Sequence, residues 1–317
     1  MSLRDLLPIY KKPIAAKFTY TFSVFTPMYN RADTIARVFK SLNAQTFKDF
    51  ELILINDGSK DNSHEVALEL MKTASFEINY INNTKNQHKM ACFNQAIDVA
   101  KGEFLLPFDS DDECTSDALA IFKNEYDSIP NDKKAAISGV TCLCKDEFGN
   151  LVGEKFPESP QYSNTFKQQL YHPNTSEKWG FTKTLILKGV QINPKIYSRG
   201  YIPEGIIWEF IAKQGFETKF VNVILRTYYL DTENAISIQN HKKDAFGMAI
   251  YSLSILNWYY ESYLYKNPNL FAKRIYTLLR ASQYLEFSLS NYQQAIQSRA
   301  LKFFFTIGWP FKRLLKW

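Results

Sequence analysis

Residues 101–112, which read KGEFLLPFDSDD, decide the fold of this chain. Within them, residues 103–108 form a short and nearly continuous apolar run, which is typical of a strand buried on both faces of a parallel sheet. In open α/β sheets, ligands bind beyond the carboxyl ends of the strands. The run therefore predicts a binding site at the three carboxylates that follow it, Asp109, Asp111 and Asp112.

Clustered carboxylates repel one another, so folding alone gives no reason to place three of them together. A hard divalent cation such as Mg²⁺ or Mn²⁺ gives a reason, because it takes oxygen ligands and bridges to substrate phosphates. The alternative is an Asp-rich cap on the following helix, with Ser116 and Asp117 near its start. The motif alone leaves both interpretations open, since Asp-x-Asp triplets are common.

Composition indicates a globular protein. The chain has 317 residues, which is enough for one large or two smaller domains. Of these residues 45% are hydrophobic and 22% charged, as in ordered globular proteins. Its formal charge of +6, from 38 basic and 32 acidic residues, is a mild excess. This excess suits a partner with phosphates or an anionic surface. We predict no nucleic-acid partner.

The cysteines and the N-terminus indicate the compartment. The four cysteines include no Cys-x-x-Cys pair, so a reducing compartment without a zinc site is the simplest interpretation. Residues 1–17 have no apolar core of the kind found in signal peptides. No segment has the apolar length needed to span a bilayer. We therefore expect a cytoplasmic protein.

Strands and helices alternate from Tyr20 onward. The first strand is predicted to end at Pro27. Predicted strands cover residues 22–26, 50–55, 77–81, 103–108, 135–144, 179–187 and 220–230, and predicted helices cover residues 32–45, 63–74 and 90–100. Repeated strand–helix units imply a parallel sheet with right-handed crossovers.

Several short motifs occur in a characteristic order over residues 20–115. They are FTPMYN at 25–30, QTF at 45–47, INDGSKD at 55–61, the segment 86–94, and AKGE at 100–103 before the carboxylates. In order and spacing they resemble the family 2 glycosyltransferases. That resemblance implies an α/β protein with the nucleotide-sugar-binding GT-A fold, a mostly parallel central sheet flanked by helices, followed here by a C-terminal helical extension. His88 departs from the pattern, because the family often carries Gly there.

The resemblance implies roles for residues at the donor site. Asp57 resembles the carboxylate that binds the uracil ring of a UDP-sugar, and its alternative role is to cap the turn at Gly58. Thr26 and Tyr29 lie at the neighbouring strand end and are expected to line the nucleoside pocket. Lys89 is expected to contact the pyrophosphate or the base, or else to be an exposed lysine at a helix start.

The same comparison separates the three carboxylates. Asp109 resembles the ribose or nucleoside contact, and Asp111 resembles the ligand of Mn²⁺ or Mg²⁺ in the Asp-x-Asp motif. Asp112 resembles the residue that lies near the transferred sugar, so we count it among the catalytic residues. Arg226, on a later predicted strand, is expected to hold phosphate or to pair with an acid.

The general base is expected at the start of a helix after residue 201. The family commonly has Glu-Asp at this place, with the Asp as the base, but this chain has Glu204 followed by Gly205. Glu204 is therefore the first choice of base and Glu209 the second. The alternative role of Glu204 is to complement the dipole of the helix from its first turn.

We predict a GT-A domain over residues 1–241 and a helical extension over residues 242–317. Residues 20–115 would form the nucleotide-sugar half of the domain, and residues 116–241 the acceptor half. From 299 to 317 the chain holds five basic residues, six Phe or Trp residues and no acid. This composition fits an interfacial segment on anionic lipid or a terminal helix packed on the core, and both interpretations stay open.

The resemblance implies an inverting, metal-dependent glycosyltransferase. It would move a sugar from a UDP-sugar to a hydroxyl of a glycan or glycolipid, in cell-surface polysaccharide biosynthesis, and would lie on the inner face of the membrane as a peripheral protein. A sugar nucleotidyltransferase is one alternative, although residues 26–31 contain no Gly-rich, basic phosphate loop. A non-catalytic glycan-assembly or membrane-binding module is the other, favoured by Gly205 and opposed by the intact carboxylate triad.

Overall fold

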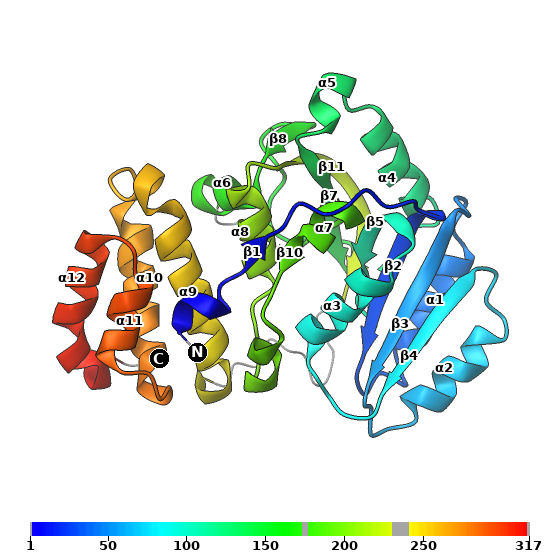
Figure 1. The fold of residues 1–317 in the computed structure, drawn as a ribbon. Coiled ribbons are helices and arrows are strands. Elements are labelled where there is room, and N and C mark those ends of the chain that lie inside the picture. The colour runs from blue at the N-terminus through cyan, green and yellow to red at the C-terminus, as the bar shows by residue number, and fades with distance from the viewer. Residues whose placement is uncertain (1, 173–176, 230–240, 316–317) are drawn as a thin grey trace. The chain divides into compact units, whose positions relative to one another are not determined.

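The computed structural model describes residues 2–172, 177–229 and 241–315 (Figure 1). The chain packs into two compact units. The sheet unit comprises residues 12–189 and 215–233, and the helical unit comprises residues 1–11, 190–214 and 234–317. The domains predicted from the sequence, 1–241 and 242–317, remain a prediction.

A mixed sheet forms the centre of the sheet unit. Four strands at one end of it are parallel and follow the order β4-β3-β2-β5, with bounds Glu77–Asn83, Phe50–Asp57, Tyr20–Met28 and Gly102–Pro107. The order continues as β9-β7-β11-β6, with β8 beside β11. Their bounds are Lys178–Lys183, Ile137–Asp146, Glu217–Tyr228, Glu113–Cys114 and Gln161–Ser163. β11 is parallel to β7, whereas β9, β6 and β8 pair antiparallel with their neighbours.

Helices cover both faces of the parallel strands, as the apolar strand sequences predict. On one face, Phe22 and Val24 of β2 belong to a buried cluster with side chains of α1, α2 and α4. On the other face, Phe25 packs against Phe93 of α3, with ring centroids 5.7 Å apart. The helices of this unit are α1 Ile35–Asn43, α2 Ser63–Met71, α3 Lys89–Val99, α4 Ala118–Asp127, α5 Asn131–Lys134, α6 Thr165–Tyr171 and α7 Thr184–Gly189.

The structure corrects two strand predictions: Pro27 does not end its strand, and the strand predicted at 179–187 is too long. β2 continues through Pro27 to Met28, because only its ladder with β5 stops at Phe25 while pairing with β3 goes on. The strand predicted up to Leu187 ends at Lys183, and α7 begins at the next residue. The Thr184 hydroxyl donates a hydrogen bond of 2.7 Å to the carbonyl oxygen of Gly102 on β5. This side-chain bond replaces the backbone ladder at the point where the chain turns into the helix.

The helical unit is built mainly from the C-terminal part of the chain, where helices were predicted. Its elements are η1 Leu3–Leu6, β1 Ile9–Tyr10, β10 Val190–Gln191, η2 Pro194–Arg199, α8 Gly205–Lys213, α9 His241–Tyr263, α10 Pro268–Ala281, η3 Ser282–Tyr284, α11 Leu289–Ala295, α12 Arg299–Gly308 and η4 Trp309–Leu314. β1 and β10 pair antiparallel. Across the described ranges, every helix is too short or too polar to cross a lipid bilayer.

Candidate functional site

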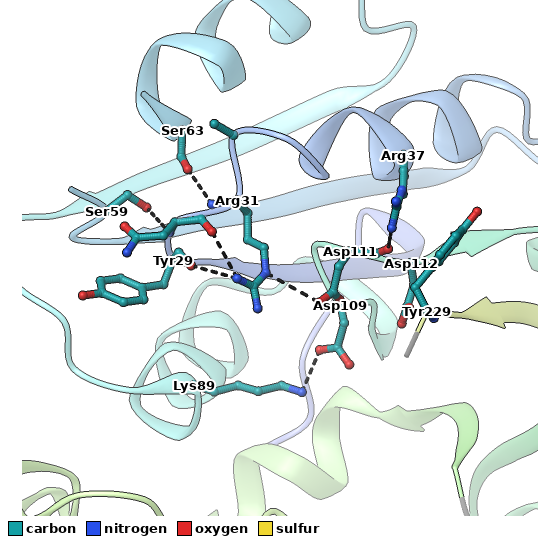
Figure 2. A network of polar contacts seen from close by, with 12 residues as sticks. Tyr29, Arg31, Arg37, Ser59, Ser63, Lys89, Asp109, Asp111, Asp112 and Tyr229 are labelled. Atoms are coloured by element: carbon teal, nitrogen blue, oxygen red, sulfur yellow. Dashed lines mark hydrogen bonds and ion pairs between the residues drawn. The ribbon is translucent and has the colours of Figure 1, made fainter. Parts of the chain in front are cut away.

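The three predicted carboxylates lie together at the carboxyl end of the parallel strands (Figure 2). β5 ends at Pro107, and the Phe108 N–H donates to the Phe25 carbonyl oxygen at 2.8 Å, so the chain leaves the sheet beside β2. The Asp112 N–H then bonds the Asp109 carbonyl oxygen at 3.3 Å and closes a turn. The strand thus delivers its carboxylates to the edge where β2 and β3 also end, as the sequence predicts.

Arg226 binds two of these carboxylates. It lies on β11, where the pairing of Arg226 with Cys114 of β6 brings it next to the carboxylate turn. Its Nη2 lies 3.0 Å from Asp109 Oδ2, and its Nε donates to Asp112 Oδ2 at 2.6 Å. Its Nη1 lies 3.3 Å from Glu177 Oε1. Of the two roles predicted for Arg226, pairing with an acid is confirmed.

Three more basic side chains line the same edge. Lys89, the first residue of α3, places its Nζ 2.7 Å from Asp109 Oδ1. Arg31 Nε lies 3.5 Å from Asp111 Oδ2, and Arg37 Nη1 donates to the Asp111 carbonyl oxygen at 2.7 Å (Figure 2). Sequence reasoning assigned no role to Arg31 or Arg37. The available signal for Arg31 was its position directly after the conspicuous strand end at residues 25–30.

The backbone at Arg31 is held by the neighbouring helix. The Arg31 N–H donates to Ser63 Oγ at 2.7 Å, and Ser63 is the first residue of α2. One residue earlier, Asn30 has a left-handed φ of 52°, and its N–H donates to Ser59 Oγ at 3.0 Å. Asn tolerates this conformation better than most residues. The turn therefore aims the Arg31 guanidinium at the carboxylates.

Burial and charge act oppositely on the carboxylates. Burial raises the pKa of Asp109, but the positive charges of Lys89 and Arg226 have the larger effect and lower this pKa to about 2. Burial raises the pKa of Asp112 to about 7; Arg226 opposes the rise, and Asp109 and Asp111 reinforce it. For Arg226, burial disfavours the charge, yet Asp109 and Asp112 outweigh it and raise the pKa of the guanidinium. Asp109, Asp112 and Arg226 are therefore electrostatically coupled to one another.

Asp112 is the most enclosed of the three. Its side chain is fully buried, and its second oxygen, Oδ1, accepts from the Tyr229 N–H at 3.1 Å. These contacts favour a role in orienting Arg226. The predicted position of Asp112 near the transferred sugar stays a prediction.

Asp57 ends β3 and holds the loop between β4 and α3. Its Oδ1 accepts from the Gln87 N–H and its Oδ2 from the His88 N–H, each at 2.9 Å. The turn at Gly58 is pressed on the same loop, because a Cβ at Gly58 would lie 2.7 Å from the Lys85 carbonyl carbon. Asn83 Nδ2 also donates to Oδ1, at 3.4 Å, so three donors hold this buried carboxylate. The predicted contact of Asp57 with uracil stays a prediction.

His88 occupies a backbone conformation that suits glycine. Its φ of 72° and ψ of 153° lie in a region that other residues rarely adopt. The bond from its N–H to Asp57 and the start of α3 at Lys89 hold it there. The family's frequent Gly at this position thus has a physical reason, and this chain keeps an exposed imidazole at the cost of backbone strain.

The other predicted nucleoside residues lie on the exit of β2. Thr26 is fully buried, and its hydroxyl has no hydrogen-bond partner in the described part of the chain. Tyr29 is half-buried, and its carbonyl oxygen accepts from Arg31 Nη1 at 3.5 Å. Their contacts with a nucleoside stay predictions.

The two candidate bases belong to the helical unit and differ in environment. Glu204 is half-buried at the N-cap of α8. Glu209 is fully buried, and neither carboxylate oxygen has a hydrogen-bond partner among the described residues. Burial raises the pKa of Glu209 to about 8, and Arg274 opposes the rise. A side chain so enclosed cannot reach an acceptor, which favours Glu204; the assignment itself stays a prediction.

A divalent cation fits Asp111 best. Its contact with Arg31 is long, at 3.5 Å, and its side chain is 17% exposed, whereas Asp109 is closely paired and Asp112 is buried. Within the described ranges, no three His, Cys, Asp or Glu side chains are grouped as a metal site. Mg²⁺ in nucleotide sites needs only one or two carboxylates, because water and substrate phosphates complete its shell. Asp111 meets that requirement.

Comparison with known proteins agrees with this geometry. A model of the family described as glycosyl transferase family 2 matches residues 23–184. The chain is 25% identical over 218 residues to the GalNAc(5)-diNAcBac-PP-undecaprenol beta-1,3-glucosyltransferase of Campylobacter jejuni, covering 68% of this chain and 67% of that protein. It is 35% identical over 105 residues to the cholesterol galactosyltransferase of Borreliella burgdorferi, covering 33% and 29%.

A solved structure supports the fold. The chain resembles S. aureus TarS 1–349 in complex with UDP-GlcNAc, with a TM-score of 0.56 and 18% identity over 89% of this chain and 83% of that one. At this identity the likeness concerns the fold alone. The α/β architecture predicted from the sequence, GT-A with C-terminal helices, is confirmed.

Proposed function

Because the chain belongs to glycosyl transferase family 2, we propose that it transfers a sugar from a nucleotide-sugar, a UDP-sugar, to a hydroxyl group of a glycan or glycolipid. A UDP donor is supported by the likeness to TarS, whose structure holds UDP-GlcNAc. A glycolipid acceptor is supported by the similarity to a glucosyltransferase named for an undecaprenol-linked substrate. Cell-surface polysaccharide biosynthesis is the corresponding process.

One observation carries the proposal, namely the alternation of carboxylates and cations at the ends of β2, β3 and β5. Lys89 and Arg31 are partly exposed, at 24% and 12%, so both are accessible to an anionic ligand at this edge. Lys89 also begins α3, whose N-terminal dipole favours negative charge. We assign Lys89 to the donor diphosphate and Asp109 to the ribose.

Asp111 is the residue that would hold Mn²⁺ or Mg²⁺. When bound, such a cation neutralises the charge that develops on the leaving diphosphate. Arg226 and Asp112 would support the site indirectly. Asp112 holds the Arg226 guanidinium, and Arg226 in turn fixes the orientation of Asp109. Asp57, Thr26 and Tyr29 would form the nucleoside pocket.

Glu204 is our candidate for the general base. It would take the proton of the acceptor hydroxyl as that oxygen attacks the anomeric carbon from the face opposite the leaving group. A single displacement of this kind inverts the anomeric configuration. Glu204 is half-buried at the N-cap of α8, where a carboxylate retains access to solvent.

Measuring nucleotide release tests the proposal. We expect Mn²⁺-stimulated UDP release from one of the donors UDP-glucose, UDP-galactose and UDP-GlcNAc, and no GDP release from GDP-mannose. Asp111→Asn should lower turnover by roughly 10²-fold, because a charge-stabilising group is lost. Asp132→Asn, at an exposed position of α5, is the matched control and should leave turnover unchanged.

The alternatives give different products in the same experiment. A sugar nucleotidyltransferase would release pyrophosphate from a nucleoside triphosphate and a sugar phosphate, and would leave the donors intact. A non-catalytic module would bind UDP without turnover. Wild-type turnover and Mn²⁺ stimulation in Asp111→Asn would remove Asp111 from the metal site.

A cytoplasmic location belongs to the same proposal. All four cysteines are free thiols, and Cys92, Cys142 and Cys144 are buried. Burial raises the pKa of each of these three thiols, so their reactivity is low. Unpaired buried cysteines fit a reducing compartment.

A further inference from the structure

Large apolar side chains cover one face of α12 and η4 without being covered themselves. Phe303 and Phe304 are the first of them, with ring centroids 5.8 Å apart. We define the outer face as five side chains that are each 51% to 74% exposed: Phe303, Phe304, Ile307, Phe311 and Leu314. Single exposed apolar residues are ordinary, but a group of this size marks a surface that contacts something apolar.

The opposite face of α12 packs against α10 and α11 of the same unit. Leu301 and Phe305 are buried, and the Phe305 ring lies 5.1 Å from that of Tyr292 on α11. A Cβ at Gly308 would lie 2.5 Å from Leu279 Cδ1 on α10, so the helix is seated closely there. Packing within the unit therefore does not account for the outer face.

The net charge of the chain comes from the segment that contains this face. Residues 268–315, from α10 to the end of η4, contain seven basic residues and a single acid, Glu286. Removing these from the totals of 38 and 32 leaves 31 of each sign, so the whole formal charge of +6 resides in this segment. Arg299 and Arg313 are exposed, and Lys302 and Lys312 are half-buried. Lys316 and Trp317, part of the predicted interfacial segment, lie outside the described residues.

Apolar side chains with a basic surround fit one occupant, the surface of an anionic lipid bilayer. Aromatic and aliphatic side chains enter the boundary between headgroups and acyl chains, while cations bind lipid phosphates. A second copy of this chain fits poorly, because a two-fold interface would place the same basic residues opposite each other. We propose that the outer face docks this protein on anionic membranes. This surface goes beyond the donor site, and its test does not depend on transferase activity.

Vesicle binding tests the proposal with the full chain. We expect the protein to sediment with vesicles rich in phosphatidylglycerol, to bind phosphatidylcholine vesicles weakly, and to dissociate as salt rises. Replacing both Phe303 and Phe304 by Ser should reduce binding by at least roughly 10-fold, because two apolar anchors are lost. Phe148→Ser is the matched control, since Phe148 is 81% exposed in the sheet unit. Unchanged unfolding midpoints would show that the variants fold.

A second measurement reports insertion directly. In Phe304→Trp, the added indole fluorescence should shift to the blue when anionic vesicles are present, relative to the same experiment with the wild-type chain. Equal vesicle binding by the Phe303/Phe304 variant and by the wild type would overturn the proposal. A dimer in light scattering that the same variant dissociates would also overturn it, in favour of a second copy as the occupant.

Discussion

Replacing Arg226 by Met removes the guanidinium but keeps much of the side-chain volume. Asp112 then stays buried without its counter-ion, since its exposure is 0% and that of Arg226 is 3%. Removing one partner of a buried ion pair destabilises a protein by about 3–5 kcal/mol. Asp109 also loses its 3.0 Å contact with Nη2, so the upper part of this range is expected. Urea unfolding at neutral pH measures the loss.

The pH dependence of stability identifies the group responsible. Arg226 opposes the rise in the pKa of Asp112, so its removal should move that pKa above about 7. The native state then keeps a proton that the unfolded chain releases near pH 4. Stability should fall by about 1.4 kcal/mol per pH unit as pH rises between these two values, and the fall should continue above pH 7 in the variant.

Two further variants make the prediction sharp. Replacing Asp112 by Leu in the Arg226→Met background removes the buried carboxyl group that lost its partner and should recover most of the lost stability. Arg299→Met, at an exposed position, should change stability by no more than about 0.5 kcal/mol. If Arg226→Met unfolds within about 1 kcal/mol of the wild type, with an unchanged pH slope, the pair does not carry the electrostatic role assigned to it.

Three other predictions concern the donor and acceptor sites. Asp57→Ala should weaken UDP binding in calorimetry while the chain stays folded; unchanged affinity would restrict Asp57 to holding the loop at residues 87–88. Glu204→Gln should lower turnover by roughly 10²–10⁴-fold with little change in UDP affinity. Glu209→Gln should turn over nearly normally, and the reverse result would reassign the base. His88→Gly should stabilise the chain against urea by about 1 kcal/mol, because relief of the strained φ outweighs the entropy that glycine adds to the unfolded state. A loss of stability would contradict the claim that the backbone at His88 is strained.

The parallel strands and their helices were predictable because apolar periodicity is a local property. The predicted strands 50–55 and 103–108 agree with β3 and β5 to within two residues at each end. The strand predicted at 179–187 failed after Lys183, where the Thr184 hydroxyl bonds a residue 82 positions earlier in the chain. Propensity within one segment cannot report such a distant partner.

Some residues of the candidate site were predictable from local sequence and others were not. Asp109 and Asp111 were predictable because a buried strand that runs into carboxylates places them at the binding edge of a parallel sheet. Arg226 was assigned only alternative roles, since it lies 117 residues after Asp109 and reaches it through the pairing of β11 with β6. Arg31 was passed over, because its direction depends on a turn held by Ser63 of α2.

The sequence by itself determined that this chain adopts the nucleotide-sugar-binding GT-A fold and that its carboxylates lie at the end of a buried strand. Strand burial, strand ends and motif order can be recognised from consecutive residues. Only the tertiary structure decided which cation neutralises which carboxylate, that Glu209 is enclosed, and that one face of α12 is left uncovered. Those properties depend on distances between segments far apart in the chain. Burial and electrostatic energy are set by such distances, and no local pattern encodes them.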